Sequence, residues 1–273
     1  MTLSEMRNLL ATGDLRLTRS LGQNFLHDGN QIRRIIALAA VGPEDSVLEI
    51  GPGLGPLTEA LLESGARVLA IEKDGRLLPI LRQRLGNQPR LELVHADALE
   101  WLANNPRDWT SWKLVANLPY SVGSPILVDL AHSPQPPRSL TATLQAEVVD
   151  RIRASPGTPE YGLLTVLLSN TFRAGPSFRI PASCFFPAPD VASACVRLDR
   201  RESPLVPPPR AADFQRLAKL AFSQRRKQLR SVLRGRFPDD PLVRAWETLG
   251  FAPDVRAETL PPELFARLSE ILP

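Results

Sequence analysis

Residues 30–135 alternate between short apolar runs and longer stretches in which apolar residues recur at helical spacing. The apolar runs predict buried strands at residues 46–50, 67–72, 91–94 and 113–116. The amphipathic stretches predict helices at residues 31–40, 57–64 and 76–85. Later in the chain, a strand that passes into a helix is predicted at residues 141–154, and a last strand at residues 191–198. Such alternation is typical of an α/β fold, in which a parallel sheet carries helices on both faces.

The pattern changes after residue 203. Residues 203–210 are rich in proline, and consecutive prolines exclude both a helix and a central strand, so this segment predicts a linker. Beyond it, residues 214–234 and 261–271 have helical periodicity, with no convincing strand between them. We therefore expect an α/β domain at residues 1–203 and a small all-helical domain at residues 204–273.

The composition excludes several classes of protein. A chain of 273 residues that is 43% hydrophobic and 23% charged can bury a sizeable core. No apolar run approaches the ~20 residues of a membrane span, and the first residues lack the layout of a signal peptide, so we expect a soluble cytoplasmic protein. Two cysteines and three scattered histidines fit neither a disulfide framework nor zinc-ligand spacing, so no metal is expected.

The positive charge is concentrated near the C-terminus. The formal net charge is +4, and residues 200–273 alone carry a balance of +5. Residues 216–236 contain eight basic side chains and no acidic one. Such a segment attracts polyphosphate backbones, although a solvated basic helix face explains the same pattern.

A glycine-rich loop follows the first strand predicted in the sheet. Residues 49–55 read Glu-Ile-Gly-Pro-Gly-Leu-Gly, and Pro56 is placed to open the next helix. Glycines allow the backbone to approach a ligand closely, and the helix N-terminus offers free N–H groups. A dinucleotide-binding motif would place its third glycine at position 56. The G-x-G-x-G spacing after an acidic residue is instead similar to the first motif of class I S-adenosylmethionine-dependent methyltransferases.

Two carboxylates stand at the ends of the following strands. Glu72 ends the second strand, 21 residues after Gly51, which is the spacing that places a carboxylate on ribose hydroxyls. Asp97 follows the third strand, where its side chain can accept a hydrogen bond from the exocyclic amine of an adenine. Glu72 fits either a dinucleotide or S-adenosylmethionine. Asp97 favours S-adenosylmethionine, and the glycine loop, Glu72 and Asp97 follow one another in the order expected for that cofactor.

The fourth strand ends in Asn117-Leu118-Pro119-Tyr120, which should face the same crevice as the glycine loop. The lone pair of an adenine N6 is delocalised into the ring, so a methyl acceptor there must be held with its amino group polarised. The Asn117 side-chain carbonyl and the Leu118 backbone carbonyl can accept both N6 hydrogens, while Tyr120 stacks on the ring. This arrangement favours methyl transfer by positioning and electrostatics rather than by a strong base.

Seven ordered motifs give the chain a family resemblance: residues 22–26, 49–55, 72–74, 97–98, 117–120, 185–193 and 221–227. With them, the chain resembles the bacterial small-subunit (16S) ribosomal RNA adenine N6,N6-dimethyltransferases of the KsgA type over nearly its whole length. The resemblance implies a Rossmann-like class I methyltransferase domain, S-adenosylmethionine as cofactor and S-adenosylhomocysteine as product.

The resemblance also implies roles for individual residues. The cofactor-binding residues it implies are Gln23, Asn24 and Leu26 over the methionine end, Gly51 and Gly53 beneath it, Glu72 at the ribose, Asp97 and Ala98 at the adenine, and Asn117 between cofactor and target. Lys73 is also expected among the cofactor-binding residues. Phe185, favoured over Phe186 by the F-x-P-x-P register, resembles the aromatic that stacks on a flipped adenosine opposite Tyr120. Arg225, Arg226, Lys227 and Arg230 are the expected RNA contacts.

Three functions remain open at this point. The first is dimethylation of two adjacent adenosines near the 3′ end of small-subunit rRNA, by a monomer that acts on an assembling 30S particle. The second is dimethylation of a single large-subunit adenosine, as in macrolide-resistance methyltransferases. The third is a non-catalytic RNA-binding assembly factor on the same scaffold, against which the presence of Asn117, Pro119, Tyr120 and Glu72 argues.

Overall fold

The computed structural model describes residues 1, 3–12, 23–224 and 226–273. These residues form two compact units, each made of two separate segments of the chain. The first contains residues 1–149 and 175–200, and the second contains residues 150–174 and 201–273.

The first unit is built on a seven-stranded sheet with the order β4-β3-β2-β5-β6-β9-β7. Its strands are β2 (Ser46–Ile50), β3 (Arg67–Glu72), β4 (Leu91–His95), β5 (Trp112–Asn117), β6 (Ser139–Gln145), β7 (Phe172–Ile180) and β9 (Ser193–Arg200). Strands β2 to β6 run parallel, and β9 runs antiparallel to β6. The predicted strands and the α/β fold class are therefore confirmed, with β2 and β3 at the predicted bounds.

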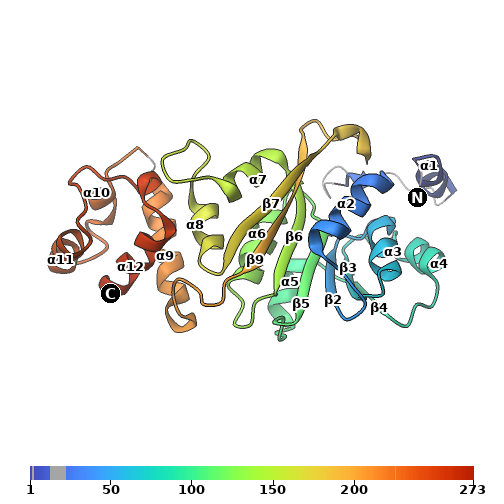
Figure 1. Cartoon of the computed structure of the whole chain (residues 1–273), viewed down its shortest axis with the longest axis horizontal. Helices are drawn as coiled ribbons and strands as arrows, with labels where there is room; N and C mark the ends of the chain where they lie inside the picture. The colour runs from blue at the N-terminus through green and yellow to red at the C-terminus, as the bar shows by residue number, and fades with distance from the viewer. Residues whose placement is uncertain (2, 13–22, 225) are drawn as a thin grey trace. The chain divides into compact units, whose positions relative to one another are not determined.

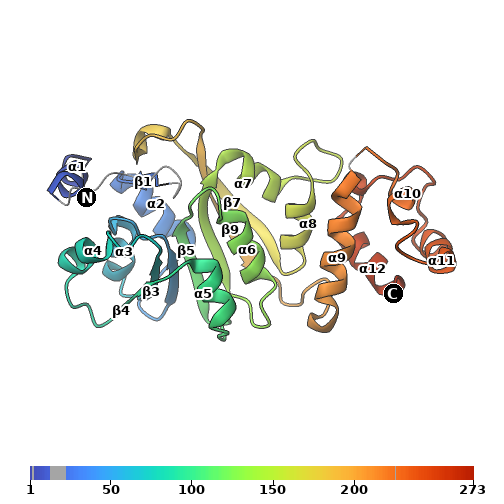
Figure 2. The ribbon, with the colours of Figure 1, turned by 180° about the vertical axis from the view of Figure 1, so that it is seen from behind.

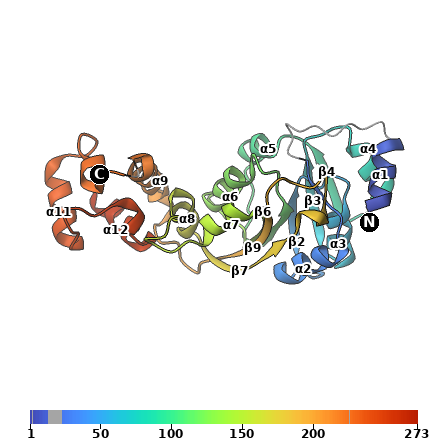
Figure 3. The same cartoon turned by 90° about the horizontal axis from the view of Figure 1, so that it is seen from above.

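Helices cover both faces of this sheet. They are α2 (Gly29–Ala39), α3 (Pro56–Glu63), α4 (Leu78–Leu85), α5 (Ala98–Asn104), α6 (Gly123–Ala131) and α7 (Ala146–Arg153). α2 and α3 lie on one face (Figure 1) and α5 and α6 on the other (Figure 2), with the sheet between the two layers (Figure 3). The core between α2, α3 and the sheet contains Ile35, Leu61, Val68 and Val115. The central strands β2, β3 and β5 are thus covered on both faces, which explains their runs of consecutive apolar residues at 47–48, 68–71 and 114–116.

Local chemistry sets the ends of these helices. The Asp28 carboxylate accepts a hydrogen bond from the Gln31 backbone N–H at 2.9 Å, so α2 starts two residues before the predicted position. α3 begins at Pro56 directly after Gly55, whose φ of 81° lies in the left-handed region. The expected role of Pro56 in opening this helix is confirmed.

Two small elements complete the first unit. Strand β1 (Phe25–Leu26) pairs with β8 (Phe185–Phe186) in a separate antiparallel sheet. Helix α1 (Leu3–Thr12) buries Met6 and Leu10 in a cluster with Phe25, Leu54 and Leu77. Neither α1 nor this sheet was predicted.

The second unit is helical. Its helices are α8 (Leu163–Ser169), α9 (Ala211–Ala221), α10 (Leu229–Leu233), α11 (Asp239–Leu249) and α12 (Pro262–Ile271). The single helix predicted over residues 214–234 is wrong, because α9 ends at Ala221 and α10 begins only at Leu229. Residues 223–228 have no apolar side chain to continue the buried stripe of α9. The Phe222 ring instead packs between those of Tyr161 and Phe265.

The two observed units have other boundaries than the expected domains at residues 1–203 and 204–273. Residues 150–174 belong with the C-terminal segment: the Tyr161 hydroxyl donates to the Leu260 carbonyl at 2.6 Å, and the Gly157 N–H donates to the Glu258 carbonyl at 2.7 Å. Within the proline-rich segment, Val206 is fully buried and its N–H donates to Asn170 Oδ1 at 2.9 Å. Val206 thus attaches this segment to Asn170, while residues 203, 204 and 207–209 are exposed.

No helix in the described part of the chain has the length and hydropathy needed to cross a membrane.

Candidate active site

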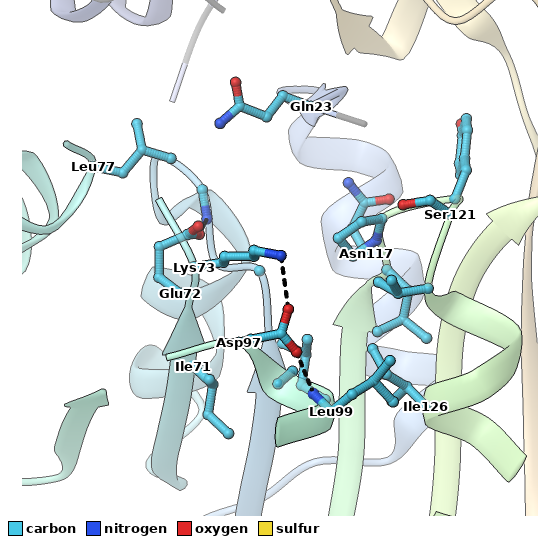
Figure 4. A pocket seen from close by; sticks show the side chains of 18 of the residues that line it. Gln23, Ile71, Glu72, Lys73, Leu77, Asp97, Leu99, Asn117, Ser121 and Ile126 are labelled. Carbon is cyan, nitrogen blue, oxygen red and sulfur yellow. Dashed lines mark hydrogen bonds and ion pairs between the residues drawn. The ribbon is translucent and has the colours of Figure 1, made fainter. Parts of the chain in front are cut away.

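A pocket opens at the carboxyl ends of β2, β3, β4 and β5, where ligands bind in open parallel sheets (Figure 4). One side is closed by residues 23–25, which precede α2. Eleven of the residues expected at the site line it: Gln23, Asn24, Gly51, Gly53, Glu72, Lys73, Asp97, Ala98, Asn117, Leu118 and Tyr120.

The glycine loop forms the floor of this pocket. Gly51, Gly53 and Gly55 all have positive φ values, of 68°, 61° and 81°. Gly53 must be glycine for two reasons. Its φ lies in the left-handed region, and a Cβ atom there would lie only 2.6 Å from the Phe25 ring. The loop backbone is thus exposed to a ligand while Phe25 packs directly against it.

Glu72 connects the glycine loop to the end of β3. Its Oε2 accepts a hydrogen bond from the Gly53 N–H at 3.1 Å, and its Oε1 accepts one from the Asp74 N–H at 2.8 Å. Burial raises the pKa of this carboxyl group, although the backbone hydrogen bonds act in the opposite direction. Each carboxylate oxygen keeps a further lone pair, so Glu72 can also accept from ribose hydroxyls.

Asp97 caps the first turn of α5 and pairs with Lys73, which follows the neighbouring strand β3. Its Oδ1 accepts from the backbone N–H groups of Leu99 and Glu100, at 2.9 and 3.3 Å. Its Oδ2 lies 2.8 Å from Lys73 Nζ, an ion pair visible in Figure 4. The hydrogen bond from Lys73 lowers the pKa of Asp97, so the carboxylate is ionised at neutral pH and can accept from an adenine amine.

Asn117 places a buried acceptor at the pocket wall. Its Nδ2 donates to the backbone carbonyl of Asn24 at 2.9 Å, and its Oδ1 is buried with no hydrogen-bond partner among the described residues. Leaving such an atom unpaired is costly, so this position fits a ligand that brings a hydrogen-bond donor. Nearby, the Tyr120 hydroxyl is fixed by a 2.7 Å hydrogen bond with Ser193 Oγ on β9.

Two expected site residues do not line the pocket. Leu26 and Phe185 are opposite each other in the β1–β8 sheet, each only 3% exposed, and both belong to the hydrophobic core beside α2 and α3. Phe186, the next residue, is half-buried beneath the Arg7 guanidinium. The stacking role implied for Phe185 stays a prediction, and this structure places its ring in the core rather than in the pocket lining.

The basic residues expected to bind RNA lie in the second unit. Arg226 and Lys227 are exposed, whereas Arg230 is half-buried with its guanidinium 5.9 Å from the centre of the Trp246 ring. Arg225 lies outside the described residues. Arg230 therefore has a packing partner that the sequence did not indicate.

Several further residues of the pocket were not predicted from the sequence. Phe25 and Leu77 contribute apolar surface to its lining, as do Val122 and Ile126 at the start of α6. Phe25 lies inside the first of the seven motifs, which was a signal for it, but nothing in the periodicity of the chain indicated the other three.

The residues present fit S-adenosylmethionine. Two acidic groups at neighbouring strand ends suit ribose hydroxyls and an adenine amine, and a loop without side chains suits close approach of the ligand. The orphaned acceptor of Asn117 lies beyond them, where an amino group to be methylated would be held. Within the described residues, no three His, Cys, Asp or Glu side chains are grouped to hold a metal ion.

Solved structures share this fold. A dimethyladenosine transferase from Plasmodium falciparum superimposes with a TM-score of 0.76 at 24% identity, over 89% of this chain and 95% of that one. The 23S rRNA methyltransferase ErmE superimposes with a TM-score of 0.69 at 30% identity, over 91% and 99% of the two chains. The expected class I methyltransferase fold is thereby confirmed.

Sequence relatives match the chain over nearly its whole length. Ribosomal RNA small subunit methyltransferase A of Phenylobacterium zucineum is 43% identical over 270 residues, covering 98% of this chain and 93% of the relative. The protein of the same name from Clostridium perfringens is 40% identical, covering 97% and 94%. The family described as "Ribosomal RNA adenine dimethylase" matches residues 15–273. The chain therefore belongs to the ribosomal RNA adenine dimethylase family.

Proposed function

We propose that this protein transfers methyl groups to N6 of two adjacent adenosines near the 3′ end of small-subunit rRNA, within an assembling 30S particle. The enzyme class and cofactor follow from the family: it is an S-adenosylmethionine-dependent rRNA adenine dimethyltransferase. The choice of the small subunit is supported by the relatives at 40–43% identity. The structural observation that carries the proposal is the buried, unpartnered Oδ1 of Asn117 in the pocket wall, for which the described residues offer no donor.

The chain's own residues hold and polarise the acceptor. Asn117 Oδ1 accepts one N6 hydrogen, and the Leu118 backbone carbonyl accepts the other, which directs the nitrogen lone pair toward the cofactor. Tyr120, whose hydroxyl is held by Ser193, offers an aromatic face for the base. S-adenosylmethionine supplies a methyl group on a sulfonium. Transfer of that methyl group would leave S-adenosylhomocysteine, and the proton displaced from N6, held until then by Asn117 Oδ1 or the Leu118 carbonyl, would pass to water.

The RNA must present an unpaired or flipped adenosine to this pocket. Flipping costs a few kcal/mol, which stacking of about 1–3 kcal/mol per base offsets. We assign the stacking partners to Tyr120 and, after a local rearrangement that exposes its ring, Phe185. The exposed cations Arg226 and Lys227, with Arg225 and Arg230, are assigned to phosphate contacts. The protein is expected to act as a monomer in the cytoplasm, where bacterial small subunits assemble.

One observation favours a second candidate. The 23S rRNA methyltransferase ErmE is 30% identical and covers 91% of this chain, so a single large-subunit adenosine is the alternative target. Its identity is lower than that of the small-subunit relatives.

Labelled S-adenosylmethionine with two substrates distinguishes these candidates. Immature 30S particles and protein-free 23S rRNA are incubated separately with the enzyme, and the modified nucleosides are identified and mapped. The proposal predicts N6,N6-dimethyladenosine at two adjacent positions near the 3′ end of 16S rRNA. Label that enters only the 23S rRNA supports the alternative and contradicts the proposal.

A further inference from the structure

Residues 23–26, which we call the strap, are held at three points beside the pocket. Gln23 Nε2 donates to Asp74 Oδ2 at 2.8 Å, and the Asn24 carbonyl accepts from Asn117 Nδ2 at 2.9 Å. The Phe25 ring packs where a Cβ atom of Gly53 would lie. The strap thus contacts the turn after β3, the end of β5 and the glycine loop, although these lie far from it in sequence.

Asp74 is a fixed anchor at the first of these points. It is only 7% exposed, and both of its oxygens accept hydrogen bonds. Oδ1 accepts from Arg76 Nε at 2.8 Å, and Oδ2 accepts from Arg76 Nη2 at 2.7 Å and from Gln23. Arg76 therefore keeps the carboxylate oriented, as bidentate pairs of this kind do. The same hydrogen bonds lower the pKa of Asp74, so it is ionised at neutral pH.

Asp74 does not itself line the pocket, whereas Gln23 does. The Asp74 side chain therefore reaches the pocket lining through Gln23, whereas the Asp74 backbone N–H, which donates to Glu72 Oε1, is kept in side-chain substitutions of Asp74. The strap also reaches Asn117, because the hydrogen bond to the Asn24 carbonyl decides which way the Asn117 amide faces. One anchored segment thus contacts both the cofactor pocket and the acceptor of the N6 hydrogen.

We propose that Asp74 is a positioning residue that seats the strap over the cofactor and, through Asn24, keeps Asn117 Oδ1 turned toward the substrate. The part of this inference that concerns Asn117 rests on the proposed function. The expected effect of Asp74 on cofactor affinity does not depend on it. The competing explanation is that Asp74 and Arg76 form only a stabilising ion pair. A merely structural ion pair predicts no coupling between Asp74 and Gln23.

A double-mutant cycle on S-adenosylhomocysteine binding tests this coupling without RNA. Calorimetry is performed on the wild type, Gln23→Ala, Asp74→Ala and the double variant. Each single substitution is expected to weaken binding about tenfold, as loss of a hydrogen bond to a charged group does. The double variant should bind no more weakly than the weaker single variant. Additive effects, or an unchanged dissociation constant for Gln23→Ala, would overturn the proposal.

Exchanging the two functional groups separates positioning from folding. Gln23→Glu places two carboxylates together and should weaken S-adenosylhomocysteine binding more than Gln23→Ala. Adding Asp74→Asn restores a carboxylate–amide pair and should recover part of the affinity. A lack of recovery, with all variants folded by circular dichroism, contradicts a direct Gln23–Asp74 role. The matched control is Asp213→Ala, which removes an aspartate that pairs with Arg216 in the second unit and should leave the affinity unchanged.

The proposed effect of Asp74 on Asn117 is tested separately, by the rate of methyl transfer. At saturating cofactor, Asp74→Ala should still lower the rate of methyl transfer, because the strap no longer fixes the Asn117 amide. A rate that returns to the wild-type value at saturation would restrict Asp74 to cofactor binding and overturn that part of the inference. A wild-type enzyme inactive on 30S particles would contradict the proposed function and leave the binding cycle intact.

Discussion

The side-chain nitrogen of Asn117 donates a hydrogen bond to the backbone carbonyl of Asn24, 2.9 Å away. Because the amide nitrogen is committed to the strap, the amide oxygen faces the other way, and it is buried with no partner among the described residues. The acceptor that we propose for a substrate amino group is therefore oriented before the substrate arrives. Such preorganisation is the property that electrostatic catalysis requires, because no dipole has to turn during the reaction.

Replacing Glu72 should weaken cofactor binding. Glu72→Ala removes a charged acceptor for ribose hydroxyls, worth roughly 1.5–3 kcal/mol, and leaves the N–H groups of Gly53 and Asp74 without their partner. Glu72→Gln keeps the side-chain size and should have a smaller effect on unfolding. Calorimetry with S-adenosylhomocysteine measures the affinity, and an unchanged dissociation constant for both variants would remove Glu72 from the cofactor site.

Gly53→Ala should lower cofactor affinity by displacing Phe25. The new Cβ atom would lie 2.6 Å from the Phe25 ring, at a residue whose φ is already 61°. The control is Gly250→Ala, which has a similar φ of 64° but no atom within 4 Å of the new Cβ position. Both variants are destabilised by a left-handed backbone, by about 1 kcal/mol or more of unfolding free energy. Only Gly53→Ala should raise the dissociation constant of S-adenosylhomocysteine, and equal constants for the two variants would refute the packing argument.

Glu49 should make the stability of the protein fall as the pH rises. It is 1% exposed, and burial raises its pKa from 4.5 to about 8. Between these values the folded chain keeps the proton while the unfolded chain has lost it. The free energy of unfolding then decreases with pH, by at most about 1.4 kcal/mol per pH unit.

Glu49→Gln isolates this effect because the amide does not titrate. Urea unfolding of both proteins from about pH 5 to about pH 8 should show the glutamine variant gaining stability relative to the wild type as the pH increases. A difference between the two proteins that is the same at every pH would show that Glu49 is ionised in the folded state.

The basic segment should contribute to RNA affinity in a salt-dependent manner. Replacing Arg225, Arg226, Lys227 and Arg230 by alanine should weaken binding to immature small subunits and leave cofactor affinity unchanged. It should also flatten the plot of log affinity against log salt, by ~0.7–0.9 for each phosphate that the variant no longer neutralises. Because Arg230 packs on Trp246, the double variant of Arg226 and Lys227 gives the cleaner electrostatic comparison.

Equal charge removal elsewhere provides the control for this experiment. Arg67 and Arg82 are exposed cations of the first unit, and replacing both by alanine should leave the salt dependence as in the wild type. If the quadruple variant also keeps wild-type affinity and slope, the segment is a solvated face. RNA binding would then depend on the pocket rim and on Arg16 and Arg19, which lie outside the described residues.

Features set by neighbouring residues could be predicted from the sequence. The strands at residues 46–50 and 67–72 are rich in apolar residues, and Pro56 marks a helix start by its own geometry. Glu72 at the end of β3 and Asp97 just after β4 line one pocket, because parallel strands end at the same edge of a sheet.

Features set by distant partners could not be predicted in this way. The hydrogen bond between Gln23 and Asp74 joins residues 51 positions apart, and the one between Tyr161 and Leu260 joins residues 99 apart. The break between α9 and α10 has the same origin, because Phe222 leaves the helical path to pack against aromatic rings of α12 and of the segment before α8. Phe185 gives no local sign that its ring lies in the core.

The measurement that tests the central claim most directly is the methylation product formed by Asn117→Ala. Wild type and variant are incubated with labelled S-adenosylmethionine and immature 30S particles, and N6,N6-dimethyladenosine is quantified, with S-adenosylhomocysteine affinity and thermal unfolding as controls. Loss of one preorganised acceptor should lower the transfer rate at saturating cofactor by ~10²–10³, while both proteins remain folded. Formation of dimethyladenosine by Asn117→Ala at the wild-type rate would contradict the assignment of Asn117 Oδ1 as the acceptor that holds the target amino group.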